Sequence, residues 1–398
     1  MSNTVPEGWQ VRSIGDLVTL QYGKSPKEVM AEDGQYPVIG TGGVTGYASS
    51  YLYDGCTTVI GRKGTINKPS YVEGKFWAID TTYFGTGYKE AEPKWLYYSL
   101  NSFDLSKYNE ASGVPSLGRD TLNAIPLLTP PLPEQQKIAA ILSSVDNVIE
   151  KTRAQIDKLK DLKTGMMQEL LTKGVGSGGV PHTEFKDSPV GRIPARWNTE
   201  LLDKVAARGS GHTPSKSKPE YWNGGIDWVS LSDTSKLDRL YINATTKQVS
   251  ELGIQNSSAI IHPPGTVVLS RDAGIGKSAI TTKEMAVSQH FIAWRCSNRL
   301  DNHFLYYLLQ FRKPKFESIA MGSTIKTIGL PFFKQLHVPI PPMSEQEAIA
   351  GALKSTDLLI FAAERRLDAT VAVKKGLMQD LLTAKVRVNV TEKETAVA

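Results

Sequence analysis

The chain has 398 residues, of which 40% are hydrophobic and 22% are charged. This composition is typical of a globular protein with two or three domains and excludes a chain that is disordered throughout. No uncharged apolar run approaches the roughly 18 residues of a membrane-spanning helix, and the N-terminal residues lack the apolar core of a secretory signal. The two cysteines, Cys56 and Cys296, form no CxxC pair. We therefore expect neither a zinc site nor a disulfide framework, and we predict a reduced, cytoplasmic protein.

The charge is unevenly distributed along the chain. The net charge is +6, yet residues 1–129 carry 11 basic and 13 acidic side chains, whereas residues 198–330 carry 16 and 11. An isoelectric point near 9.0 permits nucleic-acid binding. The acidic first third means that net charge alone does not predict such binding.

Residues 1–129 are predicted to form a first mixed α/β domain, with short strands and many glycine turns. Residues 57–60, Thr-Thr-Val-Ile, favour a strand. The sequence Gly-Arg-Lys-Gly at residues 61–64 follows as a basic turn, and residues 95–100 have the pattern of a helix with one face in the core.

Residues 130–173 are predicted to form one long helical region. Apolar side chains recur at alternate spacings of four and three residues, a 3.5-residue period that favours a coiled coil over more than four heptads. Lys163 interrupts this seam, and Gly165 follows it inside the helix, where glycine costs about 1 kcal/mol relative to alanine. We therefore expect two helix backbones to approach closely at Gly165.

Residues 174–193 are predicted to be a linker rich in glycine, serine and proline, and residues 194–340 a second mixed α/β domain. Residues 266–269 favour a strand that leads into another basic glycine turn, and residues 304–309 favour a helix. The second domain therefore has the same order of predicted elements as the first.

Residues 341–386 repeat the long helical region, and residues 387–398 are predicted to be a frayed tail. Residues 341–384 match residues 130–173 without a gap at 18 of 44 positions, and Lys374 and Gly376 stand where Lys163 and Gly165 stand in the first copy. A seam of this length has little to bury on one small domain, so we expect the two helices to pair with each other. The predicted fold class is α+β: two mixed α/β domains separated by two long helices that form an intramolecular antiparallel coiled coil, with a pseudo-two-fold duplication. The alternative is that each helix packs only on its own domain.

Several catalytic motifs are approached but not completed. Residues 274–278, Gly-Ile-Gly-Lys-Ser, would need a further glycine at the position of Arg271 to form a P-loop. Residues 40–46 do not match GxGxxG, and the six histidines never have HExxH spacing. These absences argue against a self-contained enzyme and against a metal site.

The duplicated segments resemble those of the specificity subunit of type I restriction-modification systems. The residues that carry the resemblance are Pro-Pro-Leu-Pro-Glu-Gln-Gln-Lys-Ile-Ala at 130–139 and Pro-Pro-Met-Ser-Glu-Gln-Glu-Ala-Ile-Ala at 341–350. Met-Gln-Glu-Leu-Leu-Thr at 167–172, Met-Gln-Asp-Leu-Leu-Thr at 378–383 and Phe-Lys-Asp-Ser-Pro-Val-Gly-Arg-Ile-Pro at 185–194 also fit. The resemblance covers nearly the whole chain, up to about Arg387.

This resemblance implies a non-catalytic subunit whose two mixed domains are target recognition domains. Each domain would read one half of a bipartite double-stranded DNA sequence, and the helices would set the separation of the domains and dock partners. The implied partners are two modification subunits, which bind S-adenosylmethionine and methylate adenine, and restriction subunits with ATP-dependent translocase and nuclease activity. ATP and Mg²⁺ would be bound by these partners, and no cofactor, metal or membrane contact is expected for this chain.

Candidate DNA contacts are basic or hydrogen-bonding side chains in turns and loops. Arginine can bind guanine through two hydrogen bonds, and a glycine turn after a strand can approach a groove; a solvated surface turn is the alternative. The candidates are Lys24, Tyr47, Arg62 and Lys63 in the first domain, and Lys216, Lys218, Arg271, Lys277 and Ser278 in the second.

Candidate residues for the coiled coil and for partner docking lie on the two long helices. A pseudo-two-fold molecule suits two copies of one partner, although the polar residues at the seam ends could instead only cap the helices. The candidates are Glu134, Gln135, Ile149, Ile156, Gly165, Gln168, Glu345, Gln346, Ile360, Leu367, Gly376 and Gln379. The competing functions are a stand-alone DNA methyltransferase or nuclease, and a structural coiled-coil adaptor.

Overall fold

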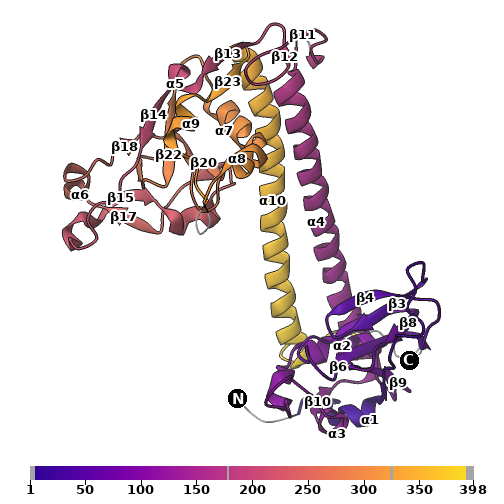
Figure 1. The fold of residues 1–398 in the computed structure, drawn as a ribbon. Helices are drawn as coiled ribbons and strands as arrows, with labels where there is room; N and C mark the ends of the chain where they lie inside the picture. Colours follow the sequence, from indigo (N-terminus) through magenta and orange to yellow (C-terminus); the bar gives the residue numbers. More distant parts are fainter. Residues whose placement is uncertain (1–4, 177–178, 323–325, 391–398) are drawn as a thin grey trace. The chain divides into compact units, whose positions relative to one another are not determined.

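The computed structural model describes residues 5–176, 179–322 and 326–390. The chain divides into two compact bodies: the first comprises residues 1–153 and 365–398, and the second comprises residues 154–364. Each body contains one mixed domain together with parts of both long helices (Figure 1).

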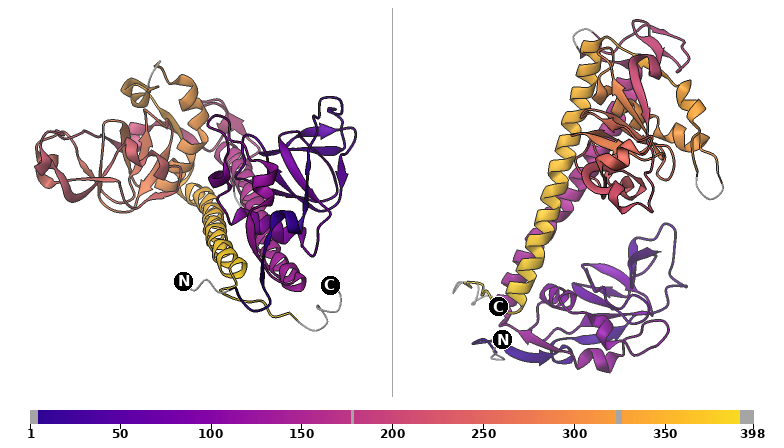
Figure 2. Two further views of the ribbon diagram at one scale, coloured as in Figure 1. Left: turned by 90° about the horizontal axis from the view of Figure 1, so that it is seen from below. Right: turned by 90° about the vertical axis from the view of Figure 1, so that its left-hand side faces the viewer.

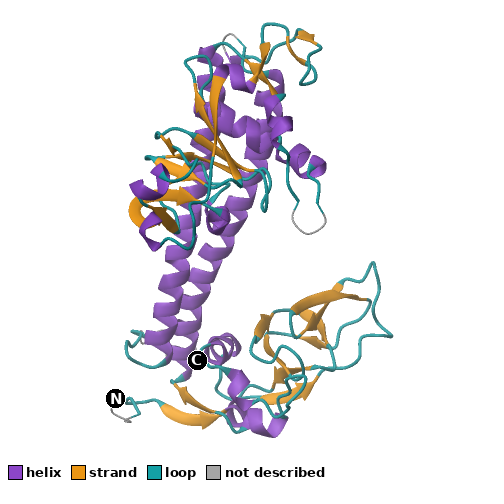
Figure 3. Cartoon of the chain, turned by 60° about the vertical axis from the view of Figure 1, so that its left-hand side comes forward, coloured by secondary structure: helices purple, strands orange, loops and turns teal. Residues whose placement is uncertain are grey.

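The first domain is built on two four-stranded sheets, drawn in orange in Figure 3. The main sheet has the order β2-β9-β6-β7 with antiparallel pairs, and the other has the order β4-β3-β8-β5 with one parallel pair, β3–β8. The strands are β2 (Thr19–Tyr22), β3 (Tyr36–Gly40), β4 (Gly43–Ala48), β5 (Tyr53–Asp54), β6 (Thr57–Gly61), β7 (Ser70–Val72), β8 (Lys75–Ala78) and β9 (Thr82–Thr86).

The second domain also has two sheets, with the orders β14-β22-β19-β20-β16 and β17-β15-β21-β18. Its parallel pairs are β15–β21 and β16–β20. The strands are β14 (Ala206–Ser210), β15 (Trp222–Val229), β16 (Tyr241–Ile242), β17 (Lys247–Val249), β18 (Ile261–His262), β19 (Val267–Ser270), β20 (Ser278–Thr281), β21 (Met285–Val287) and β22 (Phe291–Cys296).

Corresponding strands occupy the same places in the two domains. The order β14-β22-β19-β20 repeats β2-β9-β6-β7, and the order of the second sheet is repeated together with its parallel pair. The predicted strands at residues 57–60 and 266–269 are confirmed as β6 and β19. The duplication seen in the helical segments therefore extends to the domains, although little sequence identity signals it there.

A helix packs on the main sheet of each domain at the predicted place. α2 (Pro93–Asn101) contacts β6 and begins at Glu92, whose side chain accepts a hydrogen bond from a backbone amide of the first turn. α7 (Asn302–Phe311) contacts β20 and begins at Asp301, which caps it in the same way. Both helices bury an aromatic face, so the predictions for residues 95–100 and 304–309 are confirmed.

The end of each domain returns to its beginning through a short antiparallel pair. β1 (Gln10–Ser13) pairs with β10 (Pro126–Thr129), and β13 (Asn198–Leu201) pairs with β23 (His337–Ile340). Each pair leads directly into a long helix. The remaining short elements are α1 (Ile14–Leu17), η1 (Leu105–Tyr108), α3 (Arg119–Asn123), β11 (Phe185–Lys186), β12 (Ile193–Pro194), α5 (Leu202–Val205), η3 (Pro219–Tyr221), η4 (Leu231–Lys236), α6 (Glu251–Gln255), α8 (Lys313–Ile319) and α9 (Leu330–Lys334).

The long helices α4 (Leu132–Lys173) and α10 (Met343–Leu382) pair in each body (Figures 1 and 2). In the second body, Lys160 lies 3.3 Å from Glu364 and Lys163 lies 2.7 Å from Asp357, so the two helices run in opposite directions. In the first body, the last turn of α10 shares a hydrophobic core with the first turns of α4. The predicted antiparallel pairing is confirmed. Of the predicted seam residues, Ile149, Ile156 and Ile360 are buried and Leu367 is half-buried.

The lysine that interrupts the α4 seam belongs to a polar cluster. Lys163 Nζ lies 2.7 Å from Asp357 Oδ1, and the Tyr307 hydroxyl donates a hydrogen bond of 2.8 Å to the other carboxylate oxygen. Burial is the main cause that raises the pKa of Tyr307, which keeps the phenol protonated as the donor. The lysine is therefore a partner in the helix pairing and not a break in it.

The first body contains the same polar cluster with the helices exchanged. Lys374 of α10 lies 2.6 Å from Asp146 Oδ1, and the Tyr98 hydroxyl donates to Asp146 Oδ2 at 2.7 Å. Burial again raises the pKa of the tyrosine. In both clusters the ammonium group lies over the ring of the tyrosine, 5.3 Å from the centroid of Tyr98 and 5.5 Å from that of Tyr307.

A buried glutamine ties the start of α4 to the first domain. Gln135 is 1% exposed; its Oε1 accepts a hydrogen bond from the Glu92 amide, and its Nε2 donates to the carbonyls of Glu90 and Pro130. The first domain and the turn before the helix thus provide hydrogen-bond partners for both ends of the buried side-chain amide. The prediction that Gln135 docks a partner is wrong, because no part of it remains available.

Gln346 repeats this arrangement at the start of α10. It is fully buried, accepts from the Asp301 amide at 2.9 Å, and donates to the carbonyls of Arg299 and Pro341. The docking prediction is therefore wrong for Gln346 as well. In each domain, a glutamine fixes the loop that caps the sheet-packed helix.

The glutamate beside each glutamine accepts a hydrogen bond from a buried tryptophan. Glu134 accepts from Trp9 Nε1 at 3.2 Å, and Glu345 accepts from Trp197 Nε1 at 3.0 Å. Arg387 completes the first site by an ion pair with Glu134. These carboxylates hold each domain to its helix; that they also dock partner subunits stays a prediction.

The linker contributes further partners to the carboxylate of Glu345, as Arg387 does to the carboxylate of Glu134. The Val175 amide and His182 Nε2 each lie 2.9 Å from Glu345 Oε1. The predicted linker is thus anchored at both sides of residues 177–178, which lie outside the described residues. The tail predicted to fray from residue 387 is anchored at that residue, and residues 391–398 lie outside the described part of the chain.

The expectation for the two helix glycines is wrong. A Cβ atom added to Gly165 or Gly376 would meet nothing within 4 Å, apart from its own helix backbone. Neither glycine permits a close approach of backbones, because both face open space.

Candidate nucleic-acid interface

Cationic side chains gather at one edge of the main sheet of the first domain. β2 and β6 both pair antiparallel with β9, so their carboxyl ends lie side by side, with Tyr22 opposite Tyr83 and Gly61 opposite Thr82. Lys24, Arg62 and Lys63 follow directly after these ends and are exposed or half-buried. The sheet topology therefore brings together three of the four contacts predicted for this domain.

Tyr22, at the end of β2, lies under two arginines. The guanidinium carbons of Arg62 and Arg119 each lie 5.1 Å from the centroid of the Tyr22 ring, the range of a cation–π interaction. Tyr22 in turn packs against Tyr83 with 5.1 Å between ring centroids. In the part of the chain that the structure describes, neither arginine has a carboxylate within 4.0 Å, so both positive charges remain uncompensated.

Backbone hydrogen bonds hold the basic turn after β6 in place. The amide of Arg62 donates to the Thr81 carbonyl at 2.8 Å, and the Arg62 carbonyl accepts from Leu117 at 2.9 Å. Gly64 has a φ of +88°, which favours glycine, and its amide donates a hydrogen bond to the Pro115 carbonyl. The segment before Arg119 is thus fixed against the turn that carries Arg62.

Sequence reasoning missed Arg119, and it assigned Tyr22 to the core or its rim in preference to a DNA contact. They are 97 positions apart, and Arg119 follows Gly118 at the start of a five-residue helix with no basic neighbour in sequence. Only the pairing of the turn with the 115–117 segment shows that they meet. Tyr47, a predicted contact, lies on β4 of the other sheet with its side chain 51% exposed.

Arg271 occupies the same place in the second domain as Arg62 in the first. Its amide donates to the His290 carbonyl at 3.0 Å, and its carbonyl accepts from Ile328 at 2.9 Å. These bonds correspond one for one to those of Arg62. The residue after the arginine differs, because Asp272 stands where the first domain has Lys63.

The surroundings of Arg271 are enclosed and contain an acid. Its Nε atom lies 3.8 Å from Asp272 Oδ1, its side chain is 19% exposed, and Nε has no hydrogen-bond partner among the described residues. Asp272 also lies 2.5 Å from His290 Nδ1 and accepts from the Thr327 hydroxyl. At this edge the charge of Arg271 therefore has a carboxylate beside it, whereas the arginines at the corresponding edge of the first domain have none within 4.0 Å among the described residues. Residues 323–325, which precede Thr327 in sequence, lie outside the described residues.

Two predicted contacts of the second domain are turned into the protein. Ser278 is fully buried, and its hydroxyl accepts a hydrogen bond from Gln310 Nε2 at 2.8 Å. Lys277 points to the Thr234 carbonyl at 3.4 Å. The prediction of a DNA contact is wrong for Ser278, because its side chain belongs to the core.

Lys216 and Lys218 are exposed in the loop after β14, as predicted for a surface loop. Lys218 lies 3.9 Å from Glu220, a weak pair in solvent. The carbonyl of His212, at the start of this loop, accepts from Trp228 Nε1, as that of Lys24 accepts from Trp77 Nε1 in the first domain. Both loops therefore leave their sheets in the same way but carry different side chains.

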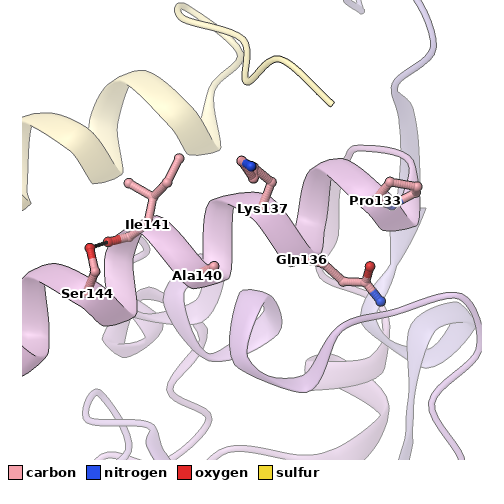
Figure 4. Close-up of a pocket in the computed structure, with 6 residues that line it drawn as sticks. All are labelled: Pro133, Gln136, Lys137, Ala140, Ile141 and Ser144. Atoms are coloured by element: carbon pink, nitrogen blue, oxygen red, sulfur yellow. Dashed lines mark hydrogen bonds between the residues drawn. The ribbon is translucent and has the colours of Figure 1, made fainter. Parts of the chain in front are cut away.

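Figure 4 shows a shallow hollow on the first turns of α4, lined by Pro133, Gln136, Lys137, Ala140, Ile141 and Ser144. Its one hydroxyl, that of Ser144, donates to the Ile141 carbonyl. Gln168 and Gln379, which were predicted to dock partners, are exposed near the ends of the helices.

Among the described residues, no group of three or more histidine, cysteine, aspartate or glutamate side chains could hold a metal ion. No helix in the described segments is long and apolar enough to cross a membrane.

Comparison with known proteins places both domains in one family. Residues 6–161 and 194–371 match the model of the type I restriction modification DNA specificity domain. The chain belongs to this family. Each of the two matches covers one mixed domain and most of the long helix that follows it, which agrees with the duplication.

Relatives match the chain over nearly its whole length. The MjaVIII specificity subunit of Methanocaldococcus jannaschii, a type I restriction enzyme subunit, is 29% identical, with 96% of this chain and 94% of that protein covered. The EcoDI specificity subunit of Escherichia coli is 22% identical, with 97% and 90% covered. The predicted family is confirmed.

A solved structure shares the fold. The S subunit of a type I restriction-modification system from M. genitalium superposes with a TM-score of 0.66 at 16% identity, with 98% of each chain covered. A structure from work on assembly and conformational transition of a type I system superposes with a TM-score of 0.54 at 15% identity, with 96% of this chain covered. The predicted fold class is confirmed.

Proposed function

We propose that this chain is the non-catalytic DNA-recognition subunit of a type I restriction-modification complex. Each domain reads one half of a bipartite sequence, and the paired helices set the separation of the halves. The observation that carries this proposal is that one scaffold occurs twice with different side chains at the same sheet edge. Two copies of one reading head with different surfaces suit a target made of two different halves.

The identity of the partners comes from the resemblance to specificity subunits, and the duplication suits two copies of one of them. Two modification subunits bind the helix pair, one on each pseudo-symmetric side, and exposed positions such as Gln168 and Gln379 contribute to their docking. The methyl donor, ATP and Mg²⁺ are bound by the modification and restriction subunits. The assembled complex then methylates adenine and cleaves DNA in an ATP-dependent manner, in the cytoplasm where the DNA is accessible.

The functional parts along the chain are proposed as follows. Residues 1–129 and 194–340 are the two reading domains, residues 130–173 and 341–386 the helical regions, 174–193 the linker and 387–398 the tail. Modest net charge suits this division, because partners that surround the duplex supply phosphate contacts, whereas base contacts in the grooves supply specificity.

The first test maps methylated adenines in cells that produce this chain with its modification subunits. A bipartite motif is expected, and replacing residues 1–129 by the corresponding domain of a relative should change one half of it only. A chain that methylates or cleaves DNA alone, with S-adenosylmethionine or Mg²⁺, would contradict the proposal and support a stand-alone enzyme. A complex that binds every duplex alike would support a structural adaptor.

The second test lengthens the helix pair. Inserting one heptad into α4 and a matching one into α10 preserves the seam and adds about 10 Å of helix. This equals about three base pairs at 3.4 Å each. The spacing between half-sites should increase by about three base pairs while the half-sites stay the same. An unchanged spacing, or a changed half-site, would contradict the role of the helices in setting separation.

A further inference from the structure

We propose that the first domain reads guanine in its half-site through Arg119 and Arg62, with Tyr22 as the positioning residue for both. This inference rests on the proposed function and names the side chains and the base through which one domain performs it. Arginine is the side chain that most often recognises guanine, by two hydrogen bonds to O6 and N7 in the major groove.

The two guanidinium groups are available for such contacts. Arg62 uses one nitrogen to donate to the Asp80 carbonyl at 3.3 Å, and no hydrogen bond within the described residues engages the guanidinium of Arg119. Tyr22 itself is 43% exposed, so the group opens to solvent. Arg119 is exposed and Arg62 is half-buried, so both guanidinium groups have donors available to a base.

The two arginines are also close enough to serve one half-site. Each guanidinium carbon lies 5.1 Å from the same ring centroid, so the two are separated by about 10 Å at most. Three base-pair steps of 3.4 Å cover this distance. Both side chains can therefore reach bases within one short segment.

Tyr22 lowers the conformational cost of binding. An arginine side chain loses about 2 kcal/mol of rotamer entropy when it is fixed, and a ring that holds both guanidinium groups removes part of this loss beforehand. The ring is itself fixed on Tyr83, whose buried hydroxyl donates to the Leu117 carbonyl at 3.1 Å. The segment before Arg119 and the ring beneath it thus share one support.

The second domain lacks this device, which makes the inference specific. Arg271 is paired with Asp272, and Leu330 follows the helix-capping Gly329 where Arg119 follows Gly118. The second half-site must therefore be read by other side chains. Loss of the first group should leave that half-site unaffected.

The experiment measures methylation by the complex of this chain with its modification subunits on a duplex library that is randomised within each half-site in turn. The variants are Arg119→Ala, Arg119→Lys, Arg62→Ala and Tyr22→Leu. Arg119→Ala should slow methylation of the preferred sequence by about 5- to 150-fold and relax one guanine position of the half-site read by residues 1–129. Arg119→Lys should also weaken reading at this position, because a flexible ammonium group lacks the rigid planar pair of donors that a guanidinium presents, and Tyr22→Leu should have a smaller effect of the same kind.

Two matched controls come from the same domain. Tyr51 is also 43% exposed, and Lys75 Nζ lies 4.8 Å from the centroid of its ring. Tyr51→Leu therefore removes a comparable cation–π pair elsewhere in the domain. Arg12→Ala removes a charge outside the sheet edge. Both variants should keep both half-sites, and an unchanged second half-site in every variant verifies that the complex is folded.

Three results would overturn the inference. The Arg119 variants could read the first half-site unchanged, they could lose activity equally on all sequences, as for a phosphate contact, or the relaxed position could fall in the other half-site. Failure of the proposed function itself is distinguishable, because the unmodified complex would then show no bipartite preference at all.

Discussion

The helix pair and the sheet edges differ in how closely the two copies agree. On the helices, lysine, aspartate and tyrosine form the same cluster twice, glutamine holds each domain by the same bonds, and glutamate accepts from a tryptophan in both copies. At the sheet edges, the backbone hydrogen bonds agree while the side chains differ, with Arg119 and Lys63 in one domain and Leu330 and Asp272 in the other. The shared residues therefore build the scaffold, and the differing ones give the two sheet edges different surfaces.

The largest effect should come from the buried glutamines, if they play the same part in both copies. Gln346→Ala removes three hydrogen bonds and leaves their partners unsatisfied, which should lower the free energy of unfolding by about 3 kcal/mol. Gln135→Ala should cost a similar amount, as measured by urea unfolding. Gln136→Ala, at the exposed neighbouring position, is the control and should change little. Very unequal costs for the two glutamines would break the equivalence of the copies.

The aspartates of the polar clusters should show a smaller and graded effect. Asp357→Ala leaves Lys163 half-buried without its carboxylate and should cost about 2 kcal/mol. Asp146→Ala should cost less, because the Asp146 side chain is 34% exposed against 17% for Asp357. Asp161→Ala, on the exposed side of α4, provides the baseline in the same unfolding experiment. If Asp357→Ala matches that baseline, the cluster does not stabilise the pairing.

Acid should affect the second body more than the first. Residues 1–129 contain no histidine, whereas burial is the main cause that lowers the pKa of His262 and of His303 in the folded second domain. The folded state then binds fewer protons than the unfolded state, so stability should fall as the pH drops below the unfolded value of about 6.5. His262→Gln should weaken this dependence in unfolding measured from pH 7.5 to 5.5. An equal loss in the variant would assign the acid effect to other groups.

The smallest expected effect is a gain in stability from replacing the two helix glycines. Gly165→Ala and Gly376→Ala should each stabilise the helices by up to about 1 kcal/mol, because both positions are open and helical. Gly23→Ala should do the opposite, since its Cβ would lie 2.0 Å from the Ile79 carbonyl oxygen. Thermal unfolding distinguishes the two signs. A loss at Gly165 would indicate a close contact that the helix pair does not contain.

The sequence predicted what depends on local pattern. The 3.5-residue period, the matched residues of the two copies and the strands β6 and β19 were all recognisable, because helix faces and strand patterns repeat at short spacing. Arg62 and Lys63 could be chosen as candidates because they are adjacent to a strand and to glycines.

The remaining site residues depend on contacts between distant segments. Tyr22 and Arg119 meet only because β9 lies between β2 and β6 and because the 115–117 segment pairs with the basic turn. Ser278 looked like a loop residue in Gly-Lys-Ser, but it begins β20 and its hydroxyl is needed by Gln310. The glycines of the helices suggested a close contact. In the sequence, however, a glycine that faces solvent looks the same as one that lies against another helix.

The anchoring of Arg387 has a consequence for the topology of the polypeptide. Its guanidinium binds both Glu134 and the backbone of Glu7, so the segment after the last helix adjoins the segment that opens the first domain, just as Val175 and His182 adjoin Glu345. The segments before β1 and after α10 are therefore neighbours within the first body. A circular permutant opened near residue 178, with its former ends joined by a short flexible peptide, would retain every contact described for either body.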